Sequence, residues 1–260
     1  PGGEGAGPPA GAGRRGICPG RTAPGTRRAG RLARSRRKPG RALAADDGWI
    51  SLFNGKDLTG WTIPDPPSSQ FESVTIKKNE AGKPIAIIAK SKKGEEITVW
   101  RVENGLLIGG GPMTHLYTVG GDYDNFRFRV TAKLNDGGNS GMFFRSAMRP
   151  GVPKGYEAQL NATHRDPIKT GSLYPNGEFG LNKYGTVFQV RDKAPHGPDE
   201  FFTQEVIADG PKITILVNGK KTIEWTDPEN RFTKGHFAVQ GHDPGSIMTF
   251  KAIEYMPLKK

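Results

Sequence analysis

Short runs of alternating apolar and polar residues, separated by turn residues, dominate this chain from Asp46 onward. In NFRFRVTAKL (125–134), Phe, Val, Ala and Leu alternate strictly with Arg, Thr and Lys. Because a strand places successive side chains on opposite faces, this pattern predicts a strand with one buried face. No window of helical length shows apolar residues at i, i+3 and i+4. The pattern therefore predicts an all-β fold, a jelly-roll β-sandwich over residues 46–260.

The connections between these runs differ in length. KITILVNGKKTIEW (212–225) contains two strand-like runs joined by Asn218-Gly219, a dipeptide preferred in type I′ hairpins because both positions need φ > 0. GHFAVQGH and IMTFKAIEY predict two further strands near the C-terminus. The segment 163–200, rich in Gly, Pro, Asn and Asp, is too long for a hairpin loop. A loop of this length in a compact domain is usually functional.

The basic charge of the chain is concentrated at its N-terminus. The formal net charge is +12, and residues 1–44 carry +10 of it, from ten Arg, Lys38 and the single acid Glu4. The first 45 residues contain few large apolar side chains, so they predict a disordered arm. A nucleic-acid-binding arm is the alternative, but no aromatic residue is interleaved for base stacking. We therefore expect no nucleic-acid partner for the nearly neutral body.

The sequence also bears on localisation and on cysteine chemistry. Ala42-Leu43-Ala44 has the small-x-small pattern of a signal-peptidase site, although no apolar run precedes it. We expect an exported protein, periplasmic or extracellular. No segment is long and apolar enough to predict a membrane span. The only cysteine, Cys18, lies in the arm, so the body offers neither a thiolate nucleophile nor a disulfide.

Three strand candidates place polar side chains opposite their apolar face. In GYEAQLNATH (155–164), Tyr, Ala and Leu alternate with Glu157, Gln159 and Asn161, and NSGMFFRS and HFAVQGH follow the same rule. Planar amide, carboxylate and guanidinium groups pair with sugar hydroxyls, and an aromatic side chain can cover the apolar face of a sugar ring. These faces therefore predict a carbohydrate site, with a plain solvated sheet face as the alternative. The remaining candidates on these faces are Phe143, Arg145, Gln240 and His242.

Several motifs occur in an order that resembles one known family. They are LFNGKDLTGW (52–61), WRVENGLLIG (100–109), LYT (116–118), NSGMFFR (139–145), GYEAQL (155–160), KTGSLY (169–174), VNG (217–219) and VQGHDPG…FKAIEY (239–255). The set resembles the 3-keto-disaccharide hydrolase family, also called the 3-keto-glucoside-1,2-lyase/3-keto-2-hydroxyglucal hydratase domain. The resemblance covers nearly all of residues 46–258 and implies a concanavalin A/glucanase-like jelly roll. The segment 73–97 is longer than the family pattern leads us to expect.

The residues on the polar strand faces favour elimination from a keto-sugar over direct hydrolysis of a glycosidic bond. A classical glycosidase needs two carboxylates, about 5–5.5 Å apart in retaining enzymes. The same-face neighbour of Glu157 is Gln159, which can neither attack nor donate a proton strongly. A 3-keto sugar instead has an acidic C2 proton, so a base can drive loss of the C1 substituent, and hydration then completes a net hydrolysis. The resemblance thus implies cleavage of a 3-keto-glycoside, the expected partner of this protein.

The resemblance and the shared face suggest roles for ten residues. Proton transfer is assigned to Glu157 and His242, with the choice of base and acid left open. Arg145 and Lys169 would stabilise the oxyanion. The expected sugar contacts are Gln159, Gln240, Asn139, Phe143, Tyr174 and Asn161.

The sequence demands no cofactor. His115, His164 and His196 are scattered, and no close pair resembles a zinc motif. A divalent cation held by Glu, His and substrate oxygens remains an open alternative. A non-catalytic carbohydrate-binding module is the principal alternative to an enzyme, because it would use the same polar face. A structural β-domain with a basic arm is the third reading.

Overall fold

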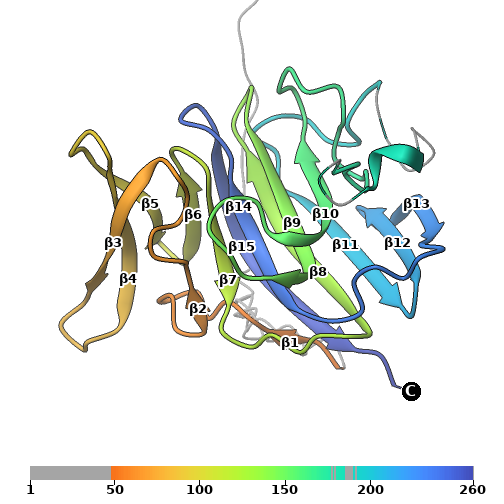
Figure 1. Ribbon diagram of the computed structural model, residues 1–260, viewed down its shortest axis with the longest axis horizontal. Helices are drawn as coiled ribbons and strands as arrows, with labels where there is room; N and C mark the ends of the chain where they lie inside the picture. The colour runs from red at the N-terminus through yellow and green to blue at the C-terminus, as the bar shows by residue number, and fades with distance from the viewer. Residues whose placement is uncertain (1–47, 177, 179, 185–189, 191, 260) are drawn as a thin grey trace, which may run out of the picture. The chain divides into compact units, whose positions relative to one another are not determined.

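The computed structural model describes residues 48–176, 178, 180–184, 190 and 192–259. The predicted arm over residues 1–45, with Cys18 and the Ala42-Leu43-Ala44 pattern, lies outside the described residues. The described chain forms two antiparallel sheets, shown in Figure 1, so the predicted all-β sandwich is confirmed. The described residues contain no helix that has both the length and the apolar composition needed to span a bilayer.

The larger sheet has the strand order β13-β12-β11-β8-β15-β6-β5-β4-β3, with β1 also paired to β15. Its strands are β1 (Ile50–Ser51), β3 (Phe71–Lys78), β4 (Pro84–Ser91), β5 (Glu96–Glu103), β6 (Leu106–Gly110), β8 (Phe126–Leu134), β11 (Phe202–Asp209), β12 (Lys212–Val217), β13 (Lys220–Thr226) and β15 (Ile247–Pro257). The long segment 73–97 forms most of β3, all of β4 and the start of β5. These strands lie at the end of the sheet away from β11–β13 (Figure 1).

The smaller sheet has the order β10-β9-β14-β7-β2. Its strands are β2 (Trp61–Thr62), β7 (Thr114–Thr118), β9 (Asn139–Ala147), β10 (Lys154–Asn161) and β14 (His236–Gly241). The three strands with polar faces, β9, β10 and β14, are therefore direct neighbours. Their adjacency, which alternation alone could not establish, brings the candidate residues onto one surface.

The core lies between the sheets and follows the predicted alternation. On β8, every second residue from Phe126 to Leu134 is buried, and the residues between are half-buried. Tyr156, Ala158 and Leu160 of β10 belong to the same core cluster. The hairpin between β12 and β13 turns at Asn218 (φ 50°) and Gly219 (φ 76°), which confirms the expected positive-φ turn.

The other face of the small sheet is also covered. Almost every residue of β9 and β10 is buried, whereas a sheet with one wet face would show alternating burial. Part of the cover comes from the segment after β10, which runs back along this edge strand. Backbone bonds join Gln159 N–H to the Ser172 carbonyl (2.9 Å) and Tyr174 N–H to the Glu157 carbonyl (2.8 Å). Residues 172–174 therefore pair with β10 at its outer edge, and this segment and the loop that leads to it bring Asp166 and Tyr174 to the polar face.

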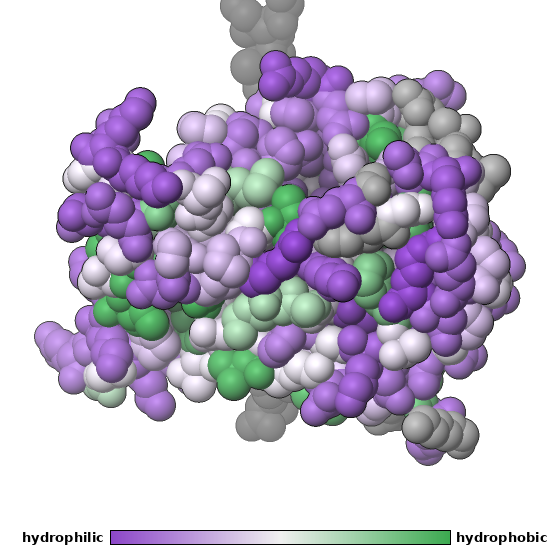
Figure 2. All heavy atoms as spheres, viewed as in Figure 1, coloured by the Kyte–Doolittle hydropathy of each residue, from purple (hydrophilic) through white to green (hydrophobic). Residues whose placement is uncertain are grey.

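One face of the molecule is mainly hydrophilic. In Figure 2 hydrophilic side chains predominate, and apolar residues gather in separate patches on that face. Large hydrophobic side chains that are exposed, such as Val119 and Ile76, are scattered in the sequence. Scattered apolar residues of this kind are normal on soluble domains.

Candidate functional site

A cavity of about 160 Å³ opens over the polar face of the small sheet. Six of the ten predicted site residues line it, and they come from β9, β10, β14 and the loops that follow β10 and β14. These are Asn139, Glu157, Gln159, Tyr174, Gln240 and His242. Met113, Val152, Asp166 and Asn176 complete the lining. The structure therefore brings together most of the residues that the face argument selected.

Glu157 lies on the floor of this cavity with only 6% of its surface exposed. Its carboxyl group makes no hydrogen bond or salt bridge to any described residue. Burial, and then the negative charge of Asp166, raise the pKa of Glu157 to about 8. Gly141 of the neighbouring strand makes room for it, because a Cβ there would lie 2.3 Å from Glu157 Oε1. The carboxyl is therefore largely protonated at neutral pH, beside open space.

Three amide side chains around Glu157 present unpaired oxygen atoms. Asn139 Oδ1, Gln159 Oε1 and Gln240 Oε1 are buried and have no partner among the described residues. The amide nitrogens of the glutamines are engaged elsewhere, Gln159 Nε2 with the Ile168 carbonyl (3.4 Å) and Gln240 Nε2 with His115 Nε2 (3.2 Å). A buried acceptor without a donor costs about 1–3 kcal/mol. The cavity is therefore rich in acceptors and suited to a ligand that donates several hydrogen bonds.

His242 is oriented by the residue that follows it. Its Nδ1 lies 2.7 Å from Asp243 Oδ2, which also accepts a hydrogen bond from Ser246 Oγ (2.8 Å). Burial opposes ionisation of Asp243, but the bonds from His242, Ser246 and the Gly245 N–H outweigh it and lower the pKa of Asp243. An ionised Asp243 places the ring proton of His242 on Nδ1. His242 Nε2 is then the acceptor atom.

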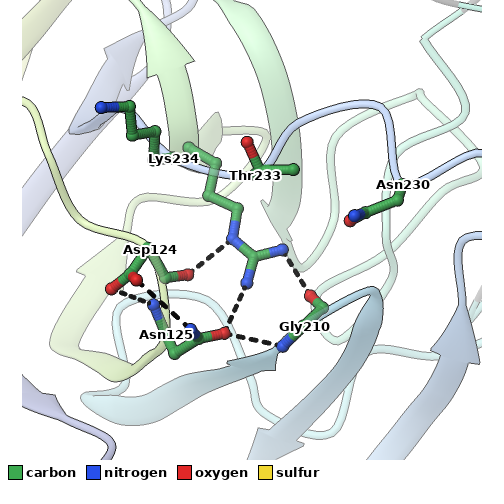
Figure 3. A pocket seen from close by; sticks show the side chains of 7 residues that line it. Asp124, Asn125, Gly210, Asn230, Thr233 and Lys234 are labelled. Carbon is green, nitrogen blue, oxygen red and sulfur yellow. Dashed lines mark hydrogen bonds between the residues drawn. The ribbon is translucent and has the colours of Figure 1, made fainter. Parts of the chain in front are cut away.

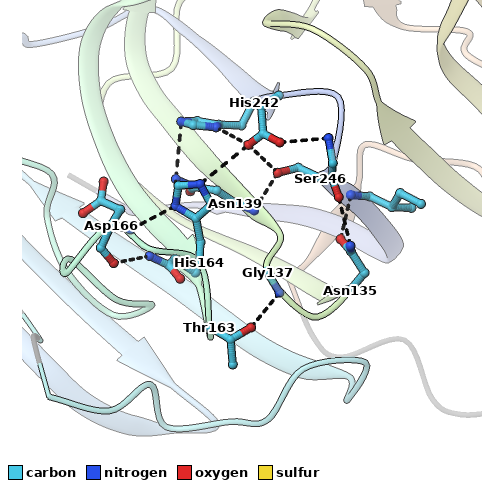
Figure 4. A network of polar contacts seen from close by, with 12 residues as sticks. Asn135, Gly137, Asn139, Thr163, His164, Asp166, His242 and Ser246 are labelled. Atoms are coloured by element: carbon cyan, nitrogen blue, oxygen red, sulfur yellow. Dashed lines mark hydrogen bonds and ion pairs between the residues drawn. The ribbon is translucent and has the colours of Figure 1, made fainter.

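A second histidine extends this network, as Figure 4 shows. The rings of His164 and His242 are 5.3 Å apart, and Asn139 Nδ2 lies 3.3 Å from His164 Nδ1 and from His242 Nε2. Burial, and then the charge of His242, lower the pKa of His164, while Asp243 and Asp166 oppose this. Both imidazoles therefore lie within reach of one amide group.

His164, His242 and Asp243 also form the described group closest to a metal-ligand set, since one ligand atom from each lies within 4.8 Å of the others. The Asp166 N–H donates to His164 Nδ1 (3.1 Å), which leaves the ring proton of His164 on Nε2, 3.8 Å from Asp243 Oδ2. His242 likewise turns its Nδ1 proton toward Asp243. His242 could bind a metal ion through Nε2 while its Nδ1 proton stays with Asp243, whereas His164 could bind one through Nε2 only after its ring proton has left that atom.

Tyr174 and Asp166 form a further part of the cavity wall. The Tyr174 hydroxyl donates to Asp166 Oδ2 (3.0 Å), and the Ile168 N–H donates to Asp166 Oδ1 (2.8 Å). Burial, and then the charge of Asp166, raise the pKa of Tyr174. Both carboxylate oxygens of Asp166 are thus engaged, and Tyr174 remains a neutral phenol.

Arg145 does not share this face, and the expected alternation fails there. The register of β9 against β10 shifts between Phe144 and Ala147, and Arg145 at this bulge has φ 49°. Its guanidinium donates to the carbonyls of Asp124 (2.7 Å), Gly210 (2.7 Å) and Phe232 (3.2 Å). It lines a separate cavity, shown in Figure 3 with Asp124, Asn125 and Lys234. Its predicted position beside Glu157 is therefore wrong.

Lys169 and Asn161 also lie outside the cavity lining. Lys169 Nζ donates to the carbonyls of His164 (2.7 Å) and Asp166 (2.8 Å), and Asn161 Nδ2 donates to the carbonyls of Asp166 (2.9 Å) and Ile168 (2.8 Å). The two side chains hold the loop after β10 by its backbone. The predicted contact of these two side chains with the sugar is therefore wrong, because their N–H groups donate to backbone carbonyls instead.

Phe143 is fully buried and does not line the cavity, so the predicted stacking aromatic is wrong. It forms a small apolar cluster with Tyr117 and Ala238, against which Val152 packs. Its ring also meets the His115 ring edge-on at 5.0 Å between centroids. The loop between β9 and β10 covers the ring, and strand alternation cannot indicate such a cover.

Asp166 and His164 were not among the residues predicted for the site. Both lie in HRDP, directly after the end of β10, where an acidic and an imidazole side chain follow a polar-faced strand. Their position after this strand was the sequence feature that could have indicated a role in the site. The alternation of apolar and polar residues, however, carries no information on where loop side chains lie. Met113, Val152 and Asn176 were missed for the same reason.

Comparison with known proteins gives relatives of the same fold. Two crystal structures of a provisionally assigned glycosyl hydrolase from Parabacteroides distasonis superpose with TM-scores of 0.57 and 0.55, at 21% and 20% identity. They cover 82% and 81% of this chain and 94% and 99% of the matched chains. An uncharacterised protein of Methanocaldococcus jannaschii is 28% identical over 157 residues, 60% of this chain and 61% of that protein. The chain thus matches about three-fifths of that relative's length.

The profile of one family matches residues 48–256, which is nearly the whole described body. The match includes every residue that lines the cavity. Membership connects the chain with carbohydrate-active proteins, in agreement with a cavity of hydrogen-bond acceptors. The chain belongs to the 3-keto-alpha-glucoside-1,2-lyase-like domain family.

Proposed function

We propose that this protein cleaves 3-keto-glycosides by eliminating the C1 substituent and then hydrating the resulting alkene. The observation that carries the proposal is Glu157, a buried carboxyl with a pKa of about 8 and no partner among the described residues, in a cavity of amide acceptors. A carboxyl tuned close to neutral pH is suited to proton transfer. Family membership supports the keto-sugar as substrate.

The proposed roles follow from the protonation states. His242, with its Nδ1 proton held by Asp243, removes the C2 proton through Nε2. The C1–O bond breaks, and the neutral carboxyl of Glu157 gives its proton to the departing oxygen. Water then adds across C1=C2, with hydroxide at C1 and a proton at C2, which completes a net hydrolysis.

Other groups of the cavity would bind the sugar. Asn139, Gln159 and Gln240 offer their unpaired oxygens to substrate hydroxyls. Arg145 and Lys169 lie elsewhere, so neither is assigned to the enolate. Asn176 is the proposed donor, since its Oδ1 accepts the Glu178 N–H (3.1 Å), which leaves its NH₂ group for the ligand.

Direct hydrolysis is the competing enzymatic reading, because Asp166 provides a second carboxylate in the cavity lining. However, Tyr174 and the Ile168 N–H each donate a hydrogen bond to one of its two oxygens. These bonds lower the nucleophilicity of Asp166, which favours elimination.

The test compares one disaccharide in its 3-keto and ordinary forms, with product release followed by chromatography. We expect turnover of the 3-keto form alone, and slower turnover when its C2 hydrogen is replaced by deuterium. Cleavage of the ordinary disaccharide would mean that the protein hydrolyses the glycosidic bond directly. Binding of both sugars without turnover would mean that the protein is a non-catalytic carbohydrate-binding module.

A further inference from the structure

The cavity at Glu157 is the first of three that share lining residues in series. Met113 and Val152 line both it and a second cavity of about 450 Å³. Gln70, Phe71 and Lys92 line both that second cavity and a third of about 340 Å³. The three therefore adjoin one another along the molecule. The first is smaller than the roughly 300–1,000 Å³ of common ligand pockets, so it can hold only a small part of an extended ligand.

The second cavity combines apolar surfaces with groups that form hydrogen bonds. Pro66 and Pro150 contribute apolar ring surfaces, and Ser69 adds an exposed hydroxyl. Ser68 Oγ is buried and has no partner among the described residues, with the residue 5% exposed. A sugar ring has an apolar face and a rim of hydroxyls, which matches this mixture. The unpaired Ser68 hydroxyl is an independent sign of a missing polar ligand.

The third cavity lies on the β3–β5 extension, the segment that is longer than the family pattern. Its further lining includes Lys93, Glu95 and Ile97. Both signs of charge are present, so the surface does not select a strongly anionic or cationic ligand. Polar contacts of this kind again suit a neutral polyhydroxyl chain.

We infer that the leaving group of the substrate is an oligosaccharide chain, which extends from the Glu157 cavity through the second and third cavities. The inference rests on the proposed function for the orientation of the ligand, with the oxidised sugar at Glu157. The sugar units beyond the scissile bond then lie against the 66–71 loop and the β4–β5 hairpin. The extension of the large sheet would thereby act in substrate selection.

The experiment uses 3-keto-oligosaccharides of one linkage, oxidised at the non-reducing end and two to five units long. We expect kcat/KM to rise by on the order of tenfold from the disaccharide to the tetrasaccharide and then to level off. The double variant Lys93→Ala/Glu95→Ala, at residues that line the third cavity and neither of the other two, should lose the part of this gain that comes from the longer chains and keep the wild-type rate on the disaccharide. Lys78→Ala, an exposed lysine on the same extension that lines none of these cavities, is the matched control.

A kcat/KM that is independent of chain length, with the disaccharide cleaved normally, would overturn the inference and leave the proposed function intact. A second measurement needs no turnover, namely calorimetric titration of unoxidised oligosaccharides into the Glu157→Gln variant. Affinity that rises with length, without cleavage of any keto-sugar by the wild type, would support the inference and refute the proposed function. Length-independent affinity would count against the inference by itself.

Discussion

Replacing Glu157 by glutamine should change how the stability of the protein depends on pH. The carboxyl has an ordinary pKa of 4.5 and a pKa of about 8 in the folded chain. Between these values the unfolded chain has lost the proton that the folded chain retains, so the free energy of unfolding falls as pH rises. At about 1.4 kcal/mol per pH unit, wild type should lose about 3–4 kcal/mol between pH 5 and pH 8 through this group. The amide of the Glu157→Gln variant cannot ionise, so that variant escapes this loss.

The assay is urea unfolding of the ligand-free wild type and of Glu157→Gln at pH 5 and pH 8. The quantity that tests the argument is the change in their stability difference between the two pH values, because constant effects of the amide cancel. Glu80→Gln, at a surface carboxyl, is the control and should follow the wild type at both pH values. Parallel pH dependences for wild type and Glu157→Gln would refute the claim that burial keeps this carboxyl protonated.

Four further outcomes follow from the site and the core. Gly141→Ala should displace the Glu157 carboxyl, because the new Cβ would lie 2.3 Å from Oε1, and initial rates should fall even where melting curves show a folded protein. Asp243→Asn should lower kcat by about 10- to 100-fold with little change in KM, since a neutral amide cannot stabilise the His242 imidazolium and can turn its NH₂ group toward Nδ1; an unchanged kcat would exclude a role for the Asp243–His242 pair in proton transfer. Wild-type kcat/KM should decline as pH rises through about 8, when Glu157 of the free protein loses the proton it donates, and a rise there would make Glu157 the base. Leu160→Asn should destabilise the fold by about 1–3 kcal/mol in denaturant unfolding, because it places an amide in the apolar core; a silent substitution would refute the face assignment of β10.

Alternation along the strands predicted the two faces of the small sheet well. The period of two is a geometric property of extended backbone, so Glu157 and Gln159 were placed correctly opposite Leu160. The same rule failed at Arg145, where a bulge with a positive φ turns the side chain away. A bulge adds one residue without changing the apolar pattern around it, so the sequence carried no sign of it.

Burial by loops was the second limit of the sequence argument. Phe143 lies on the predicted face, but the loop between β9 and β10 covers it, and Val152 packs there. Conversely, Asp166 reaches the cavity from a loop whose path depends on side-chain bonds from Asn161 and Lys169 to its backbone. These interactions join residues through turns rather than through a repeating geometry. The alternation of apolar and polar residues along a strand therefore cannot predict these loop contacts.

The outermost strands of the large sheet bear on how copies of the protein behave in concentrated solution. β3 and β13 end the sheet on its two sides, and an unpaired strand edge can template aggregation. β3 carries Lys77 and Lys78, and β13 begins with Lys220 and Lys221. Edge-to-edge pairing of two copies would bring like charges together, and salt near 0.15 M would shorten this repulsion to about 8 Å. Colloidal stability at low ionic strength is thus a consequence of where the sheet ends.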